Sequence, residues 1–302
     1  MPLSDLFRDL LPQEAIRENV PMSAYTTMRV GGPADVLLSP ATEAELPAVL
    51  DRIHQENIPL LIVGNGSNLL VSDACFRGVI LHIGRNYGKI SCDGNHICAQ
   101  SGALLSTLAK TAEENSLTGL EFAAGIPGSV GGGIYMNAGA YGGEISQVLT
   151  KARVWIDGES QEWTNERLAF GYRHSALMEA GGVVLSAEFE LSAGEHTEIT
   201  AKMADFNKRR REKQPLQYPS CGSFFKRPTG YFAGALIEQS GLKGYAIGDA
   251  QVSDLHAGFI INRGHATAQQ IYDLMRHVQK TVLENSGVTL EPEVRLIGQF
   301  ES

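Results

Sequence analysis

The sequence predicts an α+β protein with a larger N-terminal domain and a smaller C-terminal one. Strand and helix signals alternate in the first third of the chain, strand signals dominate the middle, and helix signals dominate the last third. The segment 192–197 is polar and poor in apolar residues, which is typical of a domain boundary. We therefore expect one domain over residues 1–195 and a second over residues 196–302.

Composition excludes several classes of protein. The 302 residues are 43% hydrophobic and 20% charged, as expected for a soluble globular chain with two or three domains. The N-terminus lacks the apolar region of a secretory signal, and no apolar run approaches the roughly 20 residues of a membrane span. We expect a cytoplasmic protein without membrane contact, and the net charge of -9 argues against nucleic acid as a partner.

Cysteine and histidine usage argues against disulfides and metal. The four cysteines form no CxxC pair, and the eight histidines form no HExxH or HxxxH pattern. Because thiols stay reduced in the cytosol, we expect no disulfide bonds and no metal site held by the protein.

The first elements read as a βαβ unit. Residues 34–39 form a strand, and Thr42 with Glu45 forms a capping box at the start of a helix. The helix has one apolar face, and residues 58–64 follow as a short apolar run that we interpret as a buried strand. This order predicts a parallel strand pair with a right-handed crossover. A turn rich in Gly, Asn and Ser comes after the second strand at its carboxyl end, where ligands of α/β sheets tend to bind.

Later segments alternate between strand and helix signals. Asp157-Gly158 predicts the turn of a hairpin over 151–164, and Thr267 with Gln270 predicts another capping box. The remaining expected elements are strands over 78–83, within 89–102, over 181–191 and over 288–297, and helices near 103–115, 197–213, 231–240 and 267–285.

The segment 125–145 contains eight glycines and a single charged residue, Glu144. Glycine inside an element costs about 0.5 to 1 kcal/mol relative to alanine, so this density must serve unusual dihedrals or close backbone approach. A flexible linker is the alternative, but apolar residues such as Ile126 and Ile134 interrupt the glycines, whereas flexible linkers are mostly Gly and Ser. We interpret the segment as a cradle for a bulky, phosphate-bearing ligand.

Three glycine-rich loops, 30–35, 64–70 and 125–140, each offer main-chain amides to an anion. None matches GxxxxGK[ST], and none has the context of a Rossmann fingerprint, so a P-loop and a Rossmann site are both disfavoured. Together the loops favour a large dinucleotide such as FAD, with an apolar slot for its ring. Candidates for that slot are Ile126, Val130, Met136 and Tyr141.

Six motifs in this order give the chain a specific resemblance over about residues 25 to 297. They are TTMRVGGPAD, GNGSNLLVSD, GIPGSVGGGIYMNAGAYGGEI, FGYRHS, YPSCGSFFKRP and LEPEVRLIG. The sequence resembles the UDP-N-acetylenolpyruvoylglucosamine reductase family, flavoenzymes of peptidoglycan precursor synthesis. The resemblance implies a non-covalent FAD in a two-lobed domain of the vanillyl-alcohol-oxidase/PCMH type, with lobes of about 1–80 and 81–195, followed by a substrate-binding domain.

The resemblance also implies a reaction and its residues. NADPH reduces the flavin, and the enolpyruvyl ether of UDP-N-acetylglucosamine then takes a hydride and a proton to give UDP-N-acetylmuramate. Ser223 matches the proton donor of the family, Arg173 its active-site arginine and Glu293 its glutamate. Taken alone, Ser223 would be read as the cap of a turn and Arg173 as a surface ion-pair former.

Chemically similar neighbours compete with two of these residues. Cys221 is a stronger acid than a serine, but we expect its side chain to point to the opposite side from Ser223. Glu291 has the same chemistry as Glu293, and alternation would put both on one strand face together with Arg295. The resemblance, and not physics, selects Glu293.

Cofactor binding is assigned to the three glycine-rich loops. The residues are Gly31, Gly32, Gly64, Asn65, Gly66, Ser67, Asn68, Gly125, Ile126, Pro127, Gly128, Ser129, Gly132, Asn137, Ala138 and Gly139.

Cationic residues are the candidates for substrate binding. The run KRRREK, 208–213, is either a solvated helix end or a source of diphosphate contacts, from Lys213 or from one of the arginines. Lys226, Arg227 and Arg295 are the other candidates. No insertion is found for the tyrosine-bearing loop of one version of the family, so the chain resembles the shorter subtype.

Two other functions are compatible with the glycine loops. One is an FAD oxidase of the same superfamily, and the other is a binder of nucleotide sugars without catalysis. For the reductase we expect a monomer.

Overall fold

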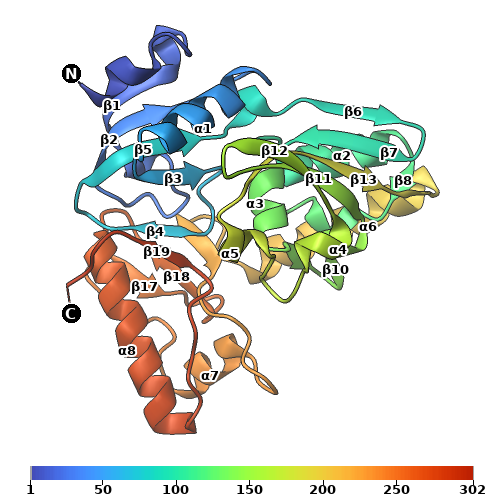
Figure 1. Ribbon diagram of the computed structural model, residues 1–302. Coiled ribbons are helices and arrows are strands. Elements are labelled where there is room, and N and C mark those ends of the chain that lie inside the picture. The colour runs from blue at the N-terminus through green and yellow to red at the C-terminus, as the bar shows by residue number, and fades with distance from the viewer. Residues whose placement is uncertain (1, 302) are drawn as a thin grey trace. The chain divides into compact units, whose positions relative to one another are not determined.

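The structure confirms the α+β class. A computed structural model describes residues 2–301 (Figure 1). Its contacts divide the chain into two compact units. The first unit contains the residues up to Asn19, Asp35–Asn65 and Arg77–Arg209. The second contains Val20–Ala34, Gly66–Phe76 and the residues from Arg210 onward.

These compact units differ from the domains expected at 1–195 and 196–302. Two short N-terminal segments belong to the second unit, and the polar segment 192–197 lies inside the first unit. There β14 (Ser192–Ala193) pairs with β8 (Leu117–Thr118). A polar stretch therefore gives no reliable boundary when the chain passes between units several times. The expected domains and lobe limits stay predictions.

The first unit begins with a four-stranded sheet in the order β1-β2-β5-β3. Helix α1 (Glu45–Gln55) starts where expected, since Thr42 and Glu45 exchange hydrogen bonds between side chains and backbone amides of 3.1 and 3.2 Å. Its face of Leu46, Val49, Leu50 and Ile53 is buried. The strands are β1 (Ile16–Pro21), β2 (Pro33–Leu38), β3 (Leu60–Val63) and β5 (Phe76–His82).

Two details of the βαβ expectation are wrong. Strand β3 is only partly buried, because Val63 is buried whereas Ile62 is 36% exposed. In addition, β2 and β3 are not neighbours, since β5 lies between them and pairs with β3 in parallel. The apolar run of four residues could not show which later strand would enter the sheet.

A second, five-stranded sheet in the order β12-β11-β13-β7-β6 completes the first unit. The turn between β11 and β12 is formed by Asp157 and Gly158, both with positive φ (50° and 85°), as the hairpin signal predicts. The strands are β6 (Ile90–Asp93), β7 (His96–Gln100), β11 (Leu149–Ile156), β12 (Glu159–Thr164) and β13 (Val183–Glu190).

Helices of the first unit share a core with this sheet. Residues of α2, α3 and the start of α6 join residues of β7, β11 and β13 in one buried cluster. A two-stranded ladder of β9 (Gly139–Ala140) and β10 (Gly143–Glu144) comes after α3. The helices are α2 (Leu105–Glu114), α3 (Val130–Tyr135), α4 (Asn165–Leu168), α5 (Leu177–Ala180) and α6 (His196–Lys213).

Two buried carboxylates anchor the start of α6. Glu113 accepts a hydrogen bond of 2.7 Å from Thr200 Oγ1, and Glu121 lies 3.4 Å from Lys202 Nζ. Glu121 also accepts hydrogen bonds from Thr118 Oγ1 (2.6 Å) and the Gly119 amide (2.9 Å). Buried charges are tolerated only when they are paired in this way.

The second unit contains the sheet β15-β18-β17-β16, a short parallel pair and two helices. The long helix α8 (Ala268–Ser286) begins at the predicted capping box, with both reciprocal bonds between Thr267 and Gln270 present. The Asp73 carboxylate accepts hydrogen bonds of 3.0 Å from the amides of its first two residues. The other elements are β4 (Leu69–Val71), β15 (Ser220–Ser223), α7 (Ala233–Gln239), β16 (Ala246–Ile247), β17 (Ala250–Val252), β18 (Phe259–Asn262) and β19 (Arg295–Ile297).

The final strand is shorter than the expected 288–297, because only β19 is regular. The preceding residues still pair with the chain near Phe224, since the Glu293 amide donates to Phe224 O and the Lys226 amide to Glu291 O. Pro292 has no amide to donate, so the pairing is an isolated bridge and not a continuous ladder.

The buried Glu121 should make stability depend on acid pH. Burial by itself raises the pKa of this carboxyl, but its hydrogen bonds and Lys202 bring the pKa below its ordinary value. Its contribution is therefore complete above about pH 4.3 and is lost as the pH falls through the lower pKa of the folded state. We expect the Tm of the native protein to fall more steeply between about pH 5 and pH 3 than that of Glu121→Gln.

The control is Glu162→Gln, which changes a glutamate whose side chain is 61% exposed. This variant should follow the native pH profile. Parallel profiles for Glu121→Gln and the native protein, measured by circular dichroism, would contradict the assignment.

Candidate active site

Two of the three glycine-rich loops meet within the first unit. A Cβ added to Gly64 would lie 2.2 Å from Ser129 Oγ and 3.3 Å from Ser129 Cβ, so any larger residue would displace the Ser129 side chain. Beside it, Asn65 Nδ2 donates a hydrogen bond of 2.8 Å to Pro127 O. The turn after β3 and the loop before α3 therefore lie against each other, as the cradle interpretation requires.

The chemistry of this pair of loops fits the diphosphate of FAD. Residues 64–65 and 125–139 contain no Asp or Glu that would repel phosphate. The amides of Val130 and Gly131, at the start of α3, donate to Ala103 O and Ser101 O, so the donors expected for an anion are other amides of these loops, together with side chains such as Ser129. Gly132, in the first turn of α3, is exposed. The donors are thus of the type that binds an anionic diphosphate.

The other glycines assigned to the cofactor lie in the second unit, where protein packing explains them. Gly66 has φ +60°, and a Cβ there would lie 1.9 Å from Tyr25 O. A Cβ on Gly31 would meet Met22, and one on Gly32 would lie 2.2 Å from Asp73 O. Close packing is sufficient to require glycine at these positions, so their role toward the cofactor stays a prediction.

Asn68 holds the segment that carries Glu293. Asn68 Nδ2 donates a hydrogen bond of 3.0 Å to Glu293 O, and the Arg295 amide donates to Asn68 O over the same distance. Asn68 immediately precedes β4, which pairs in parallel with β19. The second glycine-rich loop is thereby linked to the C-terminal motif LEPEVRLIG.

The expected apolar slot is only partly supported. Val130 is fully buried in the core beside α2, which excludes it from a slot open to a ligand. Tyr141 is 40% exposed and stacks on Phe206 of α6 at a centroid distance of 4.5 Å. Ile126 is half-buried against the same core as Val130, and Met136 directly follows α3 as its C-cap.

Arg173 lies in a strained two-residue turn. Gly171 and His174 close the turn with backbone hydrogen bonds of 3.0 and 3.3 Å, and Arg173 has a left-handed φ of 55°. Such a conformation costs about 1 to 3 kcal/mol and is concentrated at functional sites. Its Nη2 atom donates to Gly139 O at 3.2 Å, which places Arg173 beside the glycine-rich stretch 125–145.

Ser175 is a residue of this turn to which the sequence assigned no role. Its side chain is fully buried, and Oγ donates a hydrogen bond of 2.7 Å to Tyr135 O at the end of α3. The motif FGYRHS contains it, but a serine beside an arginine and a histidine gives no sequence signal of burial.

Ser223 and Cys221 point in different directions, as expected, but alternation is not the reason. Ser223 is exposed, whereas Cys221 is 4% exposed and part of the core. Residues two apart in a regular strand share a face. Here the pairing of β15 with β18 shifts between Ser220 and Ser223, and Gly222 has φ 80°. This irregularity turns the serine away from the core.

The two glutamates of LEPEVRLIG are also distinguished. Glu291 has a side chain that is 72% exposed, and its Oε2 lies 3.4 Å from Lys226 Nζ. Glu293 is half-buried and close enough to Cys221 to contribute, after burial itself, to raising the pKa of that thiol. The expected common face for Glu291, Glu293 and Arg295 stays a prediction, because regular strand geometry begins only at Arg295.

The four cationic candidates for substrate binding are partly or fully exposed. Lys213 is the last residue of α6, and Lys226 contacts Glu291 as described. The Arg227 guanidinium lies 4.0 Å from the centroid of the Phe232 ring, a cation–π contact. Arg295 opens β19 and is exposed.

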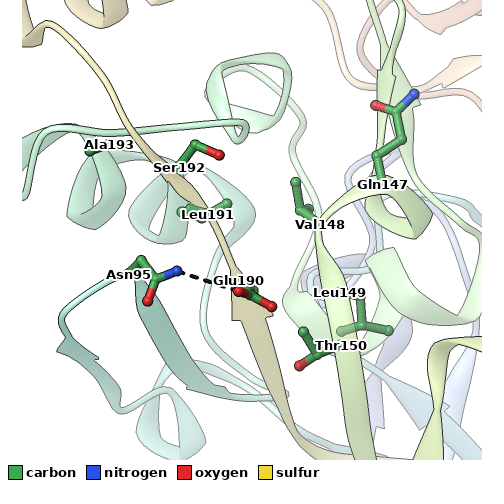
Figure 2. A pocket seen from close by; sticks show the side chains of 9 residues that line it. All are labelled: Asn95, Gln147, Val148, Leu149, Thr150, Glu190, Leu191, Ser192 and Ala193. Atoms are coloured by element: carbon green, nitrogen blue, oxygen red, sulfur yellow. Dashed lines mark hydrogen bonds between the residues drawn. The ribbon is translucent and has the colours of Figure 1, made fainter.

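The first unit also contains an open pocket of about 620 Å³ (Figure 2). Its walls come from the ends of β11 and β13 and from Asn95, which hydrogen-bonds Glu190 at 3.5 Å. None of the residues expected to bind cofactor or substrate lines it. The lining residues are Asn95, Gln147, Val148, Leu149, Thr150, Glu190, Leu191, Ser192 and Ala193.

The described part of the chain offers neither a metal-binding cluster nor a membrane-spanning helix. Within residues 2–301, no group of three or more His, Cys, Asp or Glu side chains is placed to hold a metal ion. No helix in this range is long and apolar enough to span a membrane.

Comparison with known proteins shows the family of the chain. Residues 34–163 match an FAD binding domain family, and residues 214–297 match the family described as UDP-N-acetylenolpyruvoylglucosamine reductase, C-terminal domain. Two curated relatives carry that reductase name. One, from Clostridium perfringens, is 49% identical over 99% of this chain and 98% of its own length. The other, from Pediococcus pentosaceus, is 50% identical over 96% of this chain and 97% of its own length.

Solved structures agree with the sequence matches. A crystal structure of UDP-N-acetylenolpyruvylglucosamine reductase from Thermus caldophilus has a TM-score of 0.82, is 36% identical, and covers 94% of this chain and 100% of its own. A glucose dehydrogenase, Phl p 4, is 13% identical over 64% of this chain and 44% of its own, with a TM-score of 0.50, and shares the fold alone. The chain therefore belongs to the UDP-N-acetylenolpyruvoylglucosamine reductase family and is an FAD-dependent oxidoreductase.

Proposed function

We propose that this chain uses NADPH to reduce the enolpyruvyl group of UDP-N-acetyl-3-O-(1-carboxyvinyl)-glucosamine, giving UDP-N-acetylmuramate for peptidoglycan synthesis. The observation that carries the proposal is full-length similarity to reductases of that name, at about half of all positions. Bound FAD supplies the capacity to accept a hydride from NADPH and to pass one to an alkene. We further propose that the protein acts as a monomer in the cytoplasm.

The chemistry defines what the side chains must do. Addition of a hydride to the alkene pushes electrons toward the enolpyruvyl carboxylate, so an enolate develops on the substrate. Fixed cationic and hydrogen-bonding groups stabilise such a charge best, because they need no reorganisation during the reaction. A proton donor must then reach the neighbouring carbon, within about 3 Å in a productive pose.

We assign the proton transfer to Ser223. Its hydroxyl is exposed at the end of β15, where the strand irregularity turns it outward. Cys221, the stronger acid in solution, is unsuited because burial raises the pKa of its thiol and the side chain packs in the core. A serine is a weak acid, but the enolate carbon is a strong base.

We assign stabilisation of the enolate to Arg173, and we assign Glu293 either to the enolic form of the intermediate or to the protonation. A guanidinium stays charged and presents paired donors in one plane, which matches a carboxylate. The two hydrogen bonds that close its turn and the contact with Gly139 limit the directions in which the Arg173 side chain can point. Glu293 is favoured over Glu291, because Glu291 is mostly exposed and faces Lys226.

We assign the UDP diphosphate to cations of the second unit. Lys213, Lys226, Arg227 and Arg295 belong to that unit and are at least partly exposed. Charge-assisted hydrogen bonds of lysine and arginine to phosphate are about twice as strong as neutral ones.

The proposal predicts the absorption spectrum of the purified protein. The protein should be yellow, and NADPH added without oxygen should bleach the flavin. Enolpyruvyl substrate added next should restore the colour in proportion to UDP-N-acetylmuramate formed. Colourless protein that still binds UDP sugars would favour a binder, and FAD that stays attached after denaturation would favour a covalent flavin oxidase.

Replacement of the proton donor should separate the two half-reactions. In Ser223→Ala, NADPH should bleach the flavin at the native rate, whereas reoxidation by substrate should slow by about 10²-fold or more, the range for loss of general acid catalysis. The measurement is stopped-flow absorbance of each half-reaction.

Ser220→Ala is the matched control, because it removes a hydroxyl from the same strand, three residues away. Both of its half-reactions should keep native rates. Reoxidation of Ser223→Ala at the native rate would show that another group donates the proton.

A further inference from the structure

Three hydrogen bonds join the end of α3 to the turn that carries Arg173. Asn137 Nδ2 donates to Gly171 O at 3.0 Å, and Ser175 Oγ donates to Tyr135 O at 2.7 Å. Arg173 Nη2 donates to Gly139 O at 3.2 Å. All these residues belong to the first unit. The segments 135–139 and 171–175 are therefore held together at three points.

Both polar atoms of the Asn137 carboxamide form hydrogen bonds within the protein. The residue is 2% exposed and has a left-handed φ of 43°, a conformation that asparagine tolerates better than most residues. Its Oδ1 accepts a hydrogen bond of 3.0 Å from the Ser146 amide while its Nδ2 donates to Gly171 O. Its carboxamide thus uses both its acceptor and its donor inside the protein.

The bond from Asn137 to Gly171 holds the start of the turn. Gly171 begins the turn, and its backbone exchanges hydrogen bonds with His174 across Tyr172 and Arg173. A strained residue such as Arg173 keeps its conformation only when its surroundings determine it strongly. Asn137 supplies one such contact from outside the turn.

We propose that Asn137 is a positioning residue, which fixes the Arg173 turn on the end of α3 and so aims the guanidinium at the developing enolate. The inference rests on the proposed function, because that function gives Arg173 its task. It gives the side chain of Asn137 a role distinct from the cofactor contact expected from its sequence motif. It also links two expected elements of the site, since the segment 137–139 is assigned to the cofactor and holds the arginine.

Two variants remove the contact in different ways. Asn137→Asp keeps the shape and the acceptor for the Ser146 amide, but replaces the donor to Gly171 O by an oxygen. Asn137→Gly removes the side chain and accepts the left-handed φ without strain, so it serves if the aspartate variant fails to fold.

The matched control is Asn165→Asp. Asn165 Nδ2 donates to Ser146 O and Leu149 O at 2.7 and 2.6 Å, so it ties down the same neighbourhood without touching the turn. Asn165→Asp should lose as much stability as Asn137→Asp loses from removal of an amide donor, while the hydrogen bonds to the Arg173 turn stay intact.

Amide hydrogen exchange of the holoenzyme tests the contact independently of the reaction. In both Asn137 variants, exchange in a peptide covering residues 171–175 should speed up at least fivefold relative to the native protein. In Asn165→Asp, the same peptide should exchange within twofold of the native rate. Unchanged exchange in both Asn137 variants would overturn the proposal.

A double-mutant cycle tests the role, with reoxidation of the reduced flavin by substrate as the readout. Asn137→Asp should slow this step about 10-fold in the native background and less than twofold in an Arg173→Ala background. Equal losses in the two backgrounds would overturn the proposal. Recovery of the native rate with excess FAD would also overturn it, by making Asn137 a cofactor-binding residue. Failure of the proposed function would show elsewhere, as a native protein that does not reduce the alkene.

Discussion

The close approach of Gly64 to Ser129 is the constraint on which the rest of the site depends. Strand β3 ends directly before Gly64, and α3 begins directly after Ser129, so this contact fixes two regular elements of the first unit through their loops. No side chain larger than glycine fits at residue 64 without moving Ser129. The loops, which carry no acidic residue, can then present their amides to a single anion.

Helix α3 links this contact to Arg173, the arginine proposed to stabilise the enolate. Its last turn leads into Asn137 and Gly139, which contact the turn of Arg173, so the cationic group is held by the segment that supplies the glycines. In the second unit, Asn68 holds the backbone of Glu293 by a hydrogen bond, and the irregular pairing of β15 exposes Ser223. In each unit, the side chains proposed to act in the reaction thus lie on backbone that is held by hydrogen bonds. This matches the general need of catalysis for groups that are fixed before the reaction.

The sequence predicted the features that depend on local chemistry. Both capping boxes, the Asp157-Gly158 hairpin and the apolar face of α1 are where the patterns put them, because neighbours within four residues determine them. Features that depend on distant partners were missed or misread. The insertion of β5 between β2 and β3, the sharing of the N-terminal segments between units, and the burial of Val130 all depend on contacts with residues far along the chain. Within the candidate site, Ser223, Arg173 and Glu293 stay predictions that rest on the family motifs. The irregularity that exposes Ser223 and the buried hydrogen bond of Ser175 have no local sequence pattern by which they could be predicted.

The most direct test of the central claim is how tightly a Gly64→Ala variant, purified with its FAD, retains that cofactor. The added methyl group would lie 2.2 Å from Ser129 Oγ and 3.3 Å from Ser129 Cβ, so the Ser129 side chain must move from its place between the loops, whereas Gly94→Ala, at a glycine of φ +59° with open space around it, leaves both loops unchanged. Fluorescence of FAD released on dilution should show at least tenfold weaker binding for Gly64→Ala, equivalent to about 1.4 kcal/mol, and native binding for Gly94→Ala. Native affinity in Gly64→Ala would contradict the account, because the contact between the loops would then have no part in holding the cofactor.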